Sequence, residues 1–411
     1  MSPRPALTEG YDAVFLDLDG VVYRGDTPIP GAPEVLRSLS DAGVPKAFLT
    51  NNASRTPEQV AEALTRMGVD AAADEVLTSA VATAELLARE GYAGSRAYAV
   101  GERGVRTALA AVGILVVDEP SAGADLVVVG WDRSVDYDKL RNASLLVERG
   151  ARLVATNADA SYPAPDGLWP GAGAILAAIT TTTGATPTVV GKPERGMFDA
   201  AAARCGATHP LVVGDRLDTD VRGAAGAGMD SLLVLSGAAS ATDLLDGSDL
   251  PTFLGADLRS LERPLVPVRP RAAAAEDAPA IAGLLEAAGL SAAGVESRLG
   301  DTTVTGPAGA PDATACLVPT GQVAILRSVA VRDGSRAGGL GTLIVTAAVQ
   351  RAKASGVSGV ALFTETAEPF FARLGFAATT REALPPAVRE SPHAKEECAA
   401  SATPMIRRIR R

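Results

Sequence analysis

Eight short runs rich in β-branched residues recur along residues 11–260, and alanine-rich stretches of helical length separate them. This alternation is typical of βαβ units. Because the runs are continuously apolar, they predict a parallel sheet with helices on both faces, which is a doubly wound α/β fold. In such sheets ligands bind beyond the carboxyl ends of the strands, so the polar residues that follow each run are candidates for a functional site. The runs are AVFLDLDG, PKAFLTNN, RAYAVG, DLVVVGWD, ARLVATN, TPTVVGKP, HPLVVGD and SLLVLSG.

The length and composition predict a soluble protein of several domains. With 411 residues, the chain exceeds the usual size of one compact domain, so we expect two or three folding units. A content of 47% apolar and 21% charged residues is ordinary for a globular protein. No apolar run reaches the length of a membrane span and the N-terminus lacks a secretory pattern, so we expect a cytoplasmic protein with no membrane partner. The three cysteines, Cys205, Cys316 and Cys398, lie far apart and predict no disulfide framework.

The negative charge of the chain is concentrated in its first part. The net charge is −10, and residues 1–265 contain 22 of the 38 basic and 35 of the 48 acidic side chains. Such a surface argues against nucleic acid as a partner. It also means that a local positive group, such as a cation, is needed before this part can hold an anionic substrate.

A domain boundary is predicted where the βαβ rhythm stops. Residues 255–270 contain three prolines, and a fresh set of helix-like and strand-like segments follows them. The segments beyond the boundary are AEDAPAIAGLLEAAG, QVAILRSVAV, a glycine turn, a long helix and GVALFTE.

Two carboxylates follow the first run. Asp17 and Asp19 are two residues apart on an extended chain and so point to the same side, and Gly20 then allows a sharp turn. If this pattern stood alone, an acidic turn or a helix cap would be the favoured explanation.

Three further runs end in groups that suit an anion or a cation. Thr50 and Asn51 offer a hydroxyl and an amide, Lys192 offers an ammonium, and Asp215 is followed five residues later by Asp220. Each has an ordinary alternative, which is a turn, a surface lysine or a capped helix start. Four strand ends with carboxylate, hydroxyl, ammonium and carboxylate groups in this order are hard to obtain by accident.

The segments DLDGVVY, LTNNAS, GKP and GDRLDTD resemble the haloacid dehalogenase superfamily, and specifically its capped sugar-phosphatase subfamily, which includes glycerol 3-phosphate and phosphoglycolate phosphatases. The resemblance covers residues 10–260 and implies a Rossmann-like core. It also implies a phosphatase in which Asp17 attacks phosphorus to form an aspartyl-phosphate. Asp19 would then serve as general acid and base, while Thr50 and Lys192 bind the phosphate oxygens.

The resemblance also implies a metal ion. Carboxylates repel a phosphoester, so Mg²⁺ is expected between them, held by Asp17, Asp215 and the backbone oxygen of Asp19, with Asp220 in support. The expected partner is a small phosphorylated metabolite. Glycerol 3-phosphate is the leading candidate, and phosphoglycolate and sugar phosphates remain open.

The residues between Thr50 and Lys192 exceed what one crossover helix requires, and by resemblance they form an inserted α/β cap domain. We therefore predict the catalytic core at 10–80 and 185–260, the cap at 81–184 and a further domain at 261–411. Caps of this subfamily cover the site, so Asn51, Asn157 and Asp159 are predicted to contact substrate. A rigid loop shaped by its prolines and glycines explains the segment around Asn157 and Asp159 equally well.

The C-terminal part shows a second resemblance. A glycine turn formed by Arg336, Gly339 and Gly341 opens a long helix, and its N–H groups suit a pyrophosphate. Together with LRSVAV, EPFFARLGF, LPPAVRESP and ECAASATPM, it resembles the GNAT acetyltransferase superfamily, an α+β fold, across 266–411. That resemblance implies that these three residues bind acetyl-CoA. Many relatives have a tyrosine acid within the FFARLGF segment, whereas Phe370 and Phe371 have no proton to give. The domain is therefore either an N-acetyltransferase for an amino acid or small amine, or a regulatory acyl-CoA sensor.

The sequence lacks the residues and motifs that other hydrolase mechanisms require. The chain has only His209 and His393, and it contains neither a Gly-x-Ser-x-Gly elbow nor a His-x-x-x-His pair. We expect both histidines to be structural or solvated.

Overall fold

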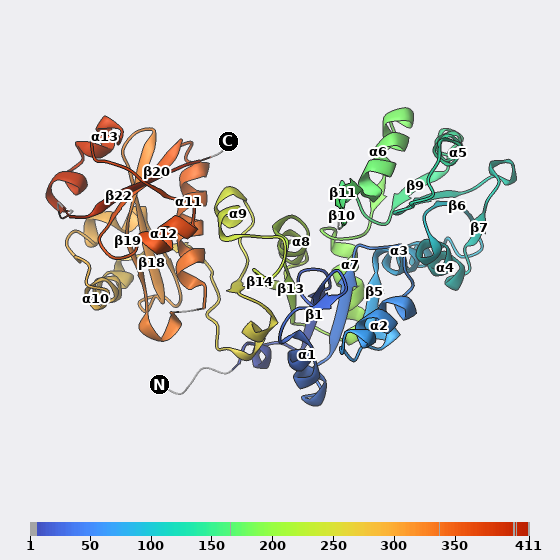
Figure 1. Cartoon of the computed structure of the whole chain (residues 1–411), viewed down its shortest axis with the longest axis horizontal. Helices are drawn as coiled ribbons and strands as arrows, with labels where there is room; N and C mark the ends of the chain where they lie inside the picture. Colours follow the sequence, from blue (N-terminus) through green and yellow to red (C-terminus); the bar gives the residue numbers. More distant parts are fainter. Residues whose placement is uncertain (1–5, 165, 337, 398, 400, 410–411) are drawn as a thin grey trace. The chain divides into compact units, whose positions relative to one another are not determined.

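The computed structural model divides into two compact units, which we describe separately (Figure 1). Of the described residues, the N-terminal unit comprises those in Leu7–Ser231 and Asp257–Glu262, and the C-terminal unit comprises Leu232–Ala256 and those from Arg263 onward, together with Ala6. The structure describes residues 6–164, 166–336, 338–397, 399 and 401–409, so Cys398 lies outside it. Within the described part of the chain, no helix combines the length and apolar character needed to cross a membrane.

The first sheet of the N-terminal unit is parallel and fully buried at its centre. Val14, Phe15 and Leu16 are inaccessible to solvent, as expected for a strand that helices cover on both sides. Phe15 lies between Val212 and Ala47 in the sheet. The strands lie in the order β13 (Pro210–Gly214), β1 (Ala13–Asp17), β4 (Lys46–Thr50) and β5 (Val76–Thr78).

The helices between these strands show why the sequence folds locally as it does. In one of them, Thr56 and Gln59 form a reciprocal capping box, and Pro57 occupies the first turn, where its missing N–H costs nothing. The same helix buries Val60 and Leu64 on one face. The helices of this part are α1 (Ala32–Asp41), α2 (Pro57–Arg66), α3 (Ser79–Arg89), α7 (Arg195–Cys205) and α8 (Arg222–Ala227).

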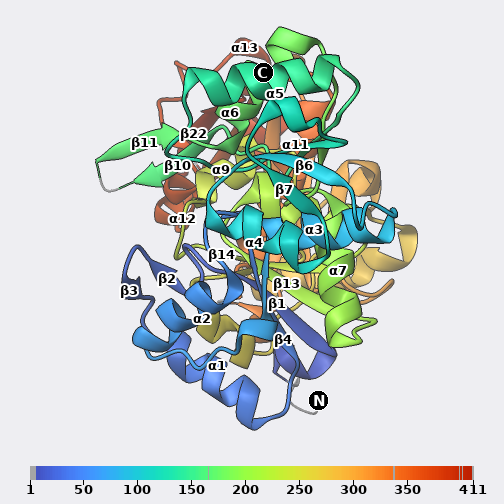
Figure 2. The same ribbon diagram turned by 90° about the vertical axis from the view of Figure 1, so that its right-hand side faces the viewer.

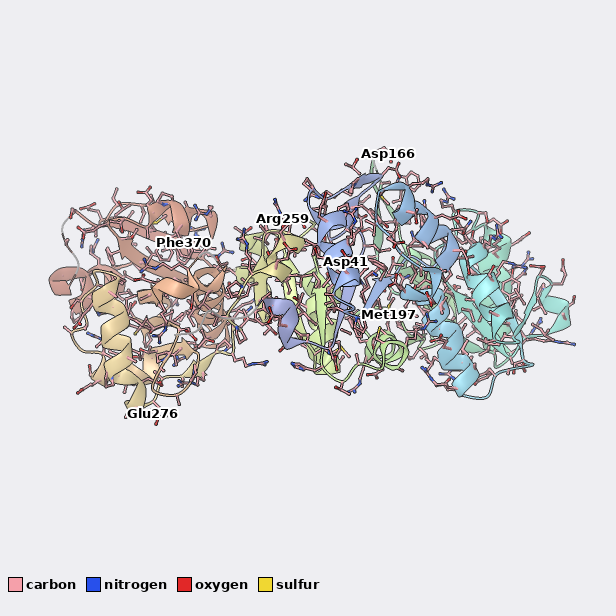
Figure 3. All side chains as sticks on the ribbon, turned by 90° about the horizontal axis from the view of Figure 1, so that it is seen from below. Asp41, Asp166, Met197, Arg259, Glu276 and Phe370 are labelled. Atoms are coloured by element: carbon pink, nitrogen blue, oxygen red, sulfur yellow. The ribbon has the colours of Figure 1, made fainter. Side chains whose placement is uncertain are left out.

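A second parallel sheet is inserted in the chain between β5 and β13. Its strand order is β12 (Thr188–Val189), β9 (Arg152–Ala155), β8 (Leu126–Val129), β6 (Arg96–Val100) and β7 (Leu115–Val117). The helices α4 (Arg103–Ala111), α5 (Tyr137–Glu148) and α6 (Ala172–Thr183) connect its strands. A hairpin of β10 (Ser161–Ala164) and β11 (Gly167–Pro170) projects from this layer, with Asp166 in its turn (Figures 2 and 3).

The two layers of the N-terminal unit share one apolar core. Phe15 and Leu49 from the first sheet belong to the same buried cluster as Val105 and Val128 from the second layer. Met197 on α7 is another member of this cluster, and Figure 3 labels it. The inserted layer is therefore packed firmly on the first sheet.

Gly104 lies at the point of closest approach between the layers. A Cβ atom there would lie 2.3 Å from the carbonyl oxygen of Ala53 and 2.5 Å from that of Arg55, and both are backbone atoms. We expect Gly104→Ala to cost about 2 kcal/mol of unfolding free energy, because the backbone after β4 must move. The matched control is Gly226→Ala on α8, where a Cβ meets nothing within 4 Å. Chemical denaturation of both variants checks this, and a Gly104→Ala protein as stable as wild type would contradict it.

The C-terminal unit contains a mixed sheet of seven strands. The order is β16 (Arg271–Ala272), β17 (Thr302–Thr305), β18 (Ala313–Pro319), β19 (Val323–Val331), β20 (Gly359–Thr364), β22 (Thr403–Arg408) and β21 (Ala377–Ala378). Within this sheet β19 and β20 pair in parallel, whereas the other neighbouring strands pair antiparallel. The helices that accompany it are α10 (Ala278–Ala287), α11 (Leu340–Ala354), α12 (Glu368–Arg373) and α13 (Pro386–Arg389).

A segment that precedes the proline-rich stretch also belongs to the C-terminal unit. It contains α9 (Ala241–Asp246) and β15 (Phe253–Gly255), which pairs in parallel with the last residues of β14 (Asp230–Val234).

The predicted fold class is confirmed, because all eight apolar runs form strands and the C-terminal part is a separate α+β domain. Several strands were not predicted, among them the short strands β5 and β7 and the longer strands β18 and β22. The predicted domain boundaries at 80, 184 and 260 stay a prediction, and the division into compact units places 232–256 with the C-terminal part.

Candidate active site

The polar residues predicted from the strand ends meet at one edge of the first sheet. Asp17 is the last residue of β1, Thr50 is the last residue of β4, and Asp215 directly follows β13. These strands are parallel neighbours, so their carboxyl ends meet at this edge. Lys192 reaches the same place from the end of β12, since its Nζ donates a hydrogen bond to Asp17 Oδ1.

Three carboxylates form a compact cluster there. One oxygen each from Asp17, Asp215 and Asp220 lies within 4.8 Å of the others. Asp215 is 4% exposed and Asp220 is 1% exposed, so water screens their mutual repulsion only weakly. A hard divalent cation prefers oxygen ligands of this kind, and it would offset the repulsion. The side chains present therefore fit Mg²⁺.

Lys192 is the ammonium group that faces the cluster. It is 4% exposed, and its Nζ also donates to Asp220 Oδ1 at 2.7 Å and to the carbonyl oxygen of Leu49 at 3.4 Å. Burial alone would lower the pKa of Lys192, but the carboxylates of Asp17 and Asp220 outweigh this effect and raise the pKa above its usual range. Lys192 is therefore a permanent cation.

At Asp17 the effect of burial on the pKa outweighs the opposing effect of Lys192. Burial raises the pKa of Asp17 to about 8, and Asp220 and Asp215 add to the rise although Lys192 opposes it. Lys192 is one cation against three carboxyl groups. A further cation beside Asp17 would therefore favour its ionised, nucleophilic form.

Both carboxylate oxygens of Asp220 accept hydrogen bonds. Oδ1 accepts from Lys192, and Oδ2 accepts from the backbone N–H of Arg216 at 3.1 Å. Gly214 permits this arrangement, because a Cβ there would lie 2.1 Å from the Cβ of Asp220. With both oxygens engaged in the protein, Asp220 suits a supporting place in the cluster.

Asp19 and Thr50 lie beside the cluster rather than in it. The side chain of Asp19 is exposed and does not belong to the cluster, and the expected role of its backbone oxygen at the metal stays a prediction. Partial desolvation of the carboxyl group still raises the pKa of Asp19, which favours a protonated form that can donate to a leaving group. Thr50 Oγ1 accepts from the backbone N–H of Asn52 at 3.1 Å, and its own hydrogen is free to turn.

Asn51, Asn157 and Asp159 form one network with Lys192. Asn51 Nδ2 donates to Asp159 Oδ2 at 3.1 Å and to the carbonyl oxygen of Lys192 at 2.9 Å. Asn157 Nδ2 donates to the carbonyl oxygen of Asn51 at 2.6 Å. Asn51 Oδ1 is buried with no hydrogen-bond partner among the described residues. The network joins the inserted layer to the first sheet, and the predicted contact of these side chains with substrate stays a prediction.

Sequence reasoning missed Tyr23. Burial first, and then the nearby charges of Asp19 and Asp17, raise the pKa of Tyr23 well above its usual range, so its hydroxyl stays protonated near the two carboxyls. Its place six residues after Asp17, in DLDGVVY, was the available signal. Tyr162, from the β10–β11 hairpin, also raises the pKa of Tyr23. The ring of Tyr162 stacks on Trp131 at a centroid distance of 4.2 Å.

The glycine turn of the C-terminal unit lies at the start of helix α11. Gly339 has φ 71° and directly precedes α11, and Arg336 forms an ion pair with Asp333 at 2.9 Å. A Cβ at Gly341 would lie 3.5 Å from the ring of Phe370, which lies on α12 (Figure 3). The three residues predicted to bind acetyl-CoA thus surround the start of the long helix, and their role stays a prediction.

Comparison with known proteins identifies the two parts of the chain. Residues 14–115 match the haloacid dehalogenase-like hydrolase family, and residues 189–261 match a second model of haloacid dehalogenase-type hydrolases. Residues 305–376 match the acetyltransferase (GNAT) family. The chain belongs to the haloacid dehalogenase-like hydrolases, is a phosphoric monoester hydrolase, and carries a C-terminal GNAT domain.

Individual relatives of the chain are phosphatases that act on small phosphate esters, as their names state. The chain is 40% identical over 260 residues to D-glycerol 3-phosphate phosphatase of Mycobacterium tuberculosis, a match of 63% of this chain and 73% of that protein. It is 38% identical over 250 residues to acid sugar phosphatase of Staphylococcus aureus, covering 60% of this chain and 95% of that one. A crystal structure of the M. tuberculosis glycerol phosphate phosphatase in complex with magnesium superposes with a TM-score of 0.66 at 33% identity, covering 85% of this chain and 92% of that one.

Proposed function

We propose that the N-terminal unit is a magnesium-dependent phosphatase that hydrolyses a small phosphometabolite through an aspartyl-phosphate on Asp17. The observation that carries this proposal is the convergence of Asp17, Asp215 and Asp220 within 4.8 Å, with Lys192 bonded to two of them. Phosphoryl transfer needs mainly positioning and the neutralisation of charge on phosphate oxygens, and these groups provide both.

Each side chain has one task in the proposed reaction. Asp17 attacks phosphorus and forms the acyl phosphate, while Asp19 gives its proton to the departing alkoxide. Asp19 then takes a proton from the water that attacks the phosphoenzyme, which restores the Asp17 carboxylate and releases phosphate. Lys192 and Thr50 bind the non-bridging oxygens of the phosphoryl group that is transferred.

Mg²⁺ would be held by the side chains of Asp17 and Asp215 and by the backbone oxygen of Asp19. When bound, it supplies positive charge to the phosphate oxygens and keeps the carboxyl group of Asp17 ionised. The high pKa of Asp17 in the absence of that charge supports this assignment.

The substrate that we propose is glycerol 3-phosphate. The similarity to a D-glycerol 3-phosphate phosphatase over 260 residues supports it. An inserted layer that covers the site would also favour small leaving groups. Sugar phosphates and phosphoglycolate are the alternatives within the same class.

A panel of phosphoesters tests the metal and the substrate together. We expect hydrolysis of p-nitrophenyl phosphate to require Mg²⁺, to stop on chelation and to return when Mg²⁺ is restored. Within the panel, we expect kcat/KM for glycerol 3-phosphate to exceed that for phosphoglycolate, mononucleotides and phosphopeptides. Full activity in the presence of a chelator would contradict the metal assignment, and preference for phosphopeptides would contradict the proposed substrate class.

For the C-terminal domain, we propose that Arg336, Gly339 and Gly341 bind the pyrophosphate of acetyl-CoA. The match to the GNAT family and the start of a 15-residue helix at this turn support the proposal. Phe370 and Phe371 provide no acid, so binding without transfer is the first expectation and N-acetylation of a small amine is the second. Equilibrium binding of acetyl-CoA and transfer of a labelled acetyl group to an amine panel distinguish the two, and absence of binding contradicts both.

A further inference from the structure

The end of the hydrolase family match does not coincide with the boundary between the two compact units. The hydrolase family match extends to residue 261, yet the structure assigns Leu232–Ala256 to the C-terminal unit. We call these residues the shared segment. It contains the last part of β14, the helix α9 and the strand β15. Its contacts within the C-terminal unit explain the assignment.

Helix α9 is short, and its carboxyl end depends on side chains from distant parts of the chain. A helix leaves its last carbonyl groups without partners, and that end carries partial negative charge. Lys353 on α11 donates to the carbonyl oxygen of Asp246 at 2.9 Å. Gln350, one turn earlier on α11, lies 3.4 Å from the carbonyl oxygen of Leu244 and 3.5 Å from that of Gly247. Helix α9 thus lies against α11 (Figure 1).

A buried ion pair adds to these contacts. Arg407 on β22 is 7% exposed, and its Nη2 donates to Asp246 Oδ1 at 2.6 Å. Its other terminal nitrogen donates to the carbonyl oxygen of Leu374 at 2.6 Å. Gly375 makes room for the guanidinium, because a Cβ there would lie 2.0 Å from Nη1. A buried guanidinium with this set of partners is lost only at a high cost, so Arg407 fixes α9 to the sheet of the C-terminal unit.

Strand β15 also contacts the C-terminal domain, through apolar side chains. Leu254 is 4% exposed, and a Cβ at Gly339 would lie 2.7 Å from the Cβ of Leu254. The backbone of the glycine turn therefore rests directly on a residue that the hydrolase family match includes. Leu244 and Leu245 of α9 are buried as well, at 0% and 2% exposed.

We propose that the C-terminal domain is an obligatory intramolecular partner of the phosphatase: it holds the shared segment, and the phosphatase loses activity when the C-terminal domain unfolds. Two independent domains would be joined by a linker with few contacts on either side. Here the last elements of the hydrolase match are instead fixed by Arg407, Gln350 and Lys353, which lie about 90 to 150 residues beyond the end of that match.

The test uses the full chain and two readouts. The first is the midpoint temperature of irreversible loss of p-nitrophenyl phosphatase activity, and the second is hydrogen exchange of peptides from 241–249. We expect Arg407→Ala to lower the midpoint by about 5 °C and to speed exchange in 241–249, because Asp246 loses its buried partner. The matched control is Arg408→Ala, the next residue of β22, whose side chain is exposed. Its midpoint should stay within about 1 °C of wild type.

Faster exchange confined to 263–409, or an unchanged midpoint of phosphatase inactivation, would overturn the proposal. If Arg407→Ala does not fold, the double variant Gln350→Met and Lys353→Met removes the bonds to α9 without leaving a buried charge unpaired. It should show the same pattern with a shift of about 2 °C. The exchange readout does not depend on phosphatase activity, so an inactive wild-type protein would count against the proposed function and not against the shared segment.

Discussion

Replacement of Asp17 by asparagine should reduce kcat for every phosphoester by at least about 10⁴-fold, because the amide cannot form the acyl phosphate. The fold should survive the change. In the protein without metal, burial and two neighbouring carboxyls disfavour the charge of Asp17, so a neutral side chain of the same shape removes a repulsion. Steady-state kinetics and thermal melting of the purified variant check both parts.

Asp12→Asn is the matched control for this prediction. Asp12 precedes the other end of β1 and accepts from the backbone N–H groups of Thr208 and His209, so it lies in the same strand region but away from the cluster. Its variant should keep kcat within about twofold of wild type. An Asp17→Asn protein that turns over at more than one per cent of the wild-type rate would contradict the assigned nucleophile.

Replacement of Lys192 by methionine should have the second large effect, and it should affect stability as well as turnover. Asp17 and Asp220 would lose their buried cation, which we expect to cost about 3 kcal/mol of unfolding free energy in the presence of a chelator. Addition of Mg²⁺ should recover part of this loss, because the cation binds the folded state only. We also expect kcat to fall by about 10³-fold, because a donor to the phosphate oxygens is missing.

Lys46→Met provides the comparison. Lys46 is also a buried lysine with a carboxylate partner, Glu75 at 2.7 Å, but it lies at the opposite end of β4 from Thr50. Its loss should reduce stability without reducing kcat of the folded enzyme. If the two lysine variants lost the same amount of activity, Lys192 would have no special part in turnover.

The strand ends explain why much of the site could be predicted from the sequence. The carboxyl ends of parallel strands meet at one edge, so Asp17, Thr50 and Asp215 were expected together as soon as their apolar runs were read as neighbouring strands. Lys192 was expected at the same edge, but its strand β12 belongs to the second sheet, and the residues after β12 bring Lys192 to the cluster.

Other features depend on tertiary contacts that leave little trace in the sequence. Tyr23 follows Asp17 by six residues, but nothing in its own type shows that it is buried beside two carboxyl groups. Asp246 and Arg407 are 161 residues apart, and an isolated aspartate and an isolated arginine are common on any surface. Their pairing, and with it the shared segment, could be recognised only from the coordinates.

The short strands missed by sequence reasoning have a local cause. Strands β5 and β7 have three residues each, which is too few for a periodic pattern to separate a strand from a loop.

The phosphoenzyme itself offers the most direct test of the account. Mixing the magnesium-loaded enzyme with radiolabelled substrate, quenching in acid within one turnover and reducing with borohydride converts an aspartyl phosphate to homoserine. We predict that one labelled phosphoryl group is trapped per chain before reduction and that homoserine then appears at position 17. Turnover with no trapped phosphoryl group, or homoserine at any other position, would contradict the claim that Asp17 is the nucleophile.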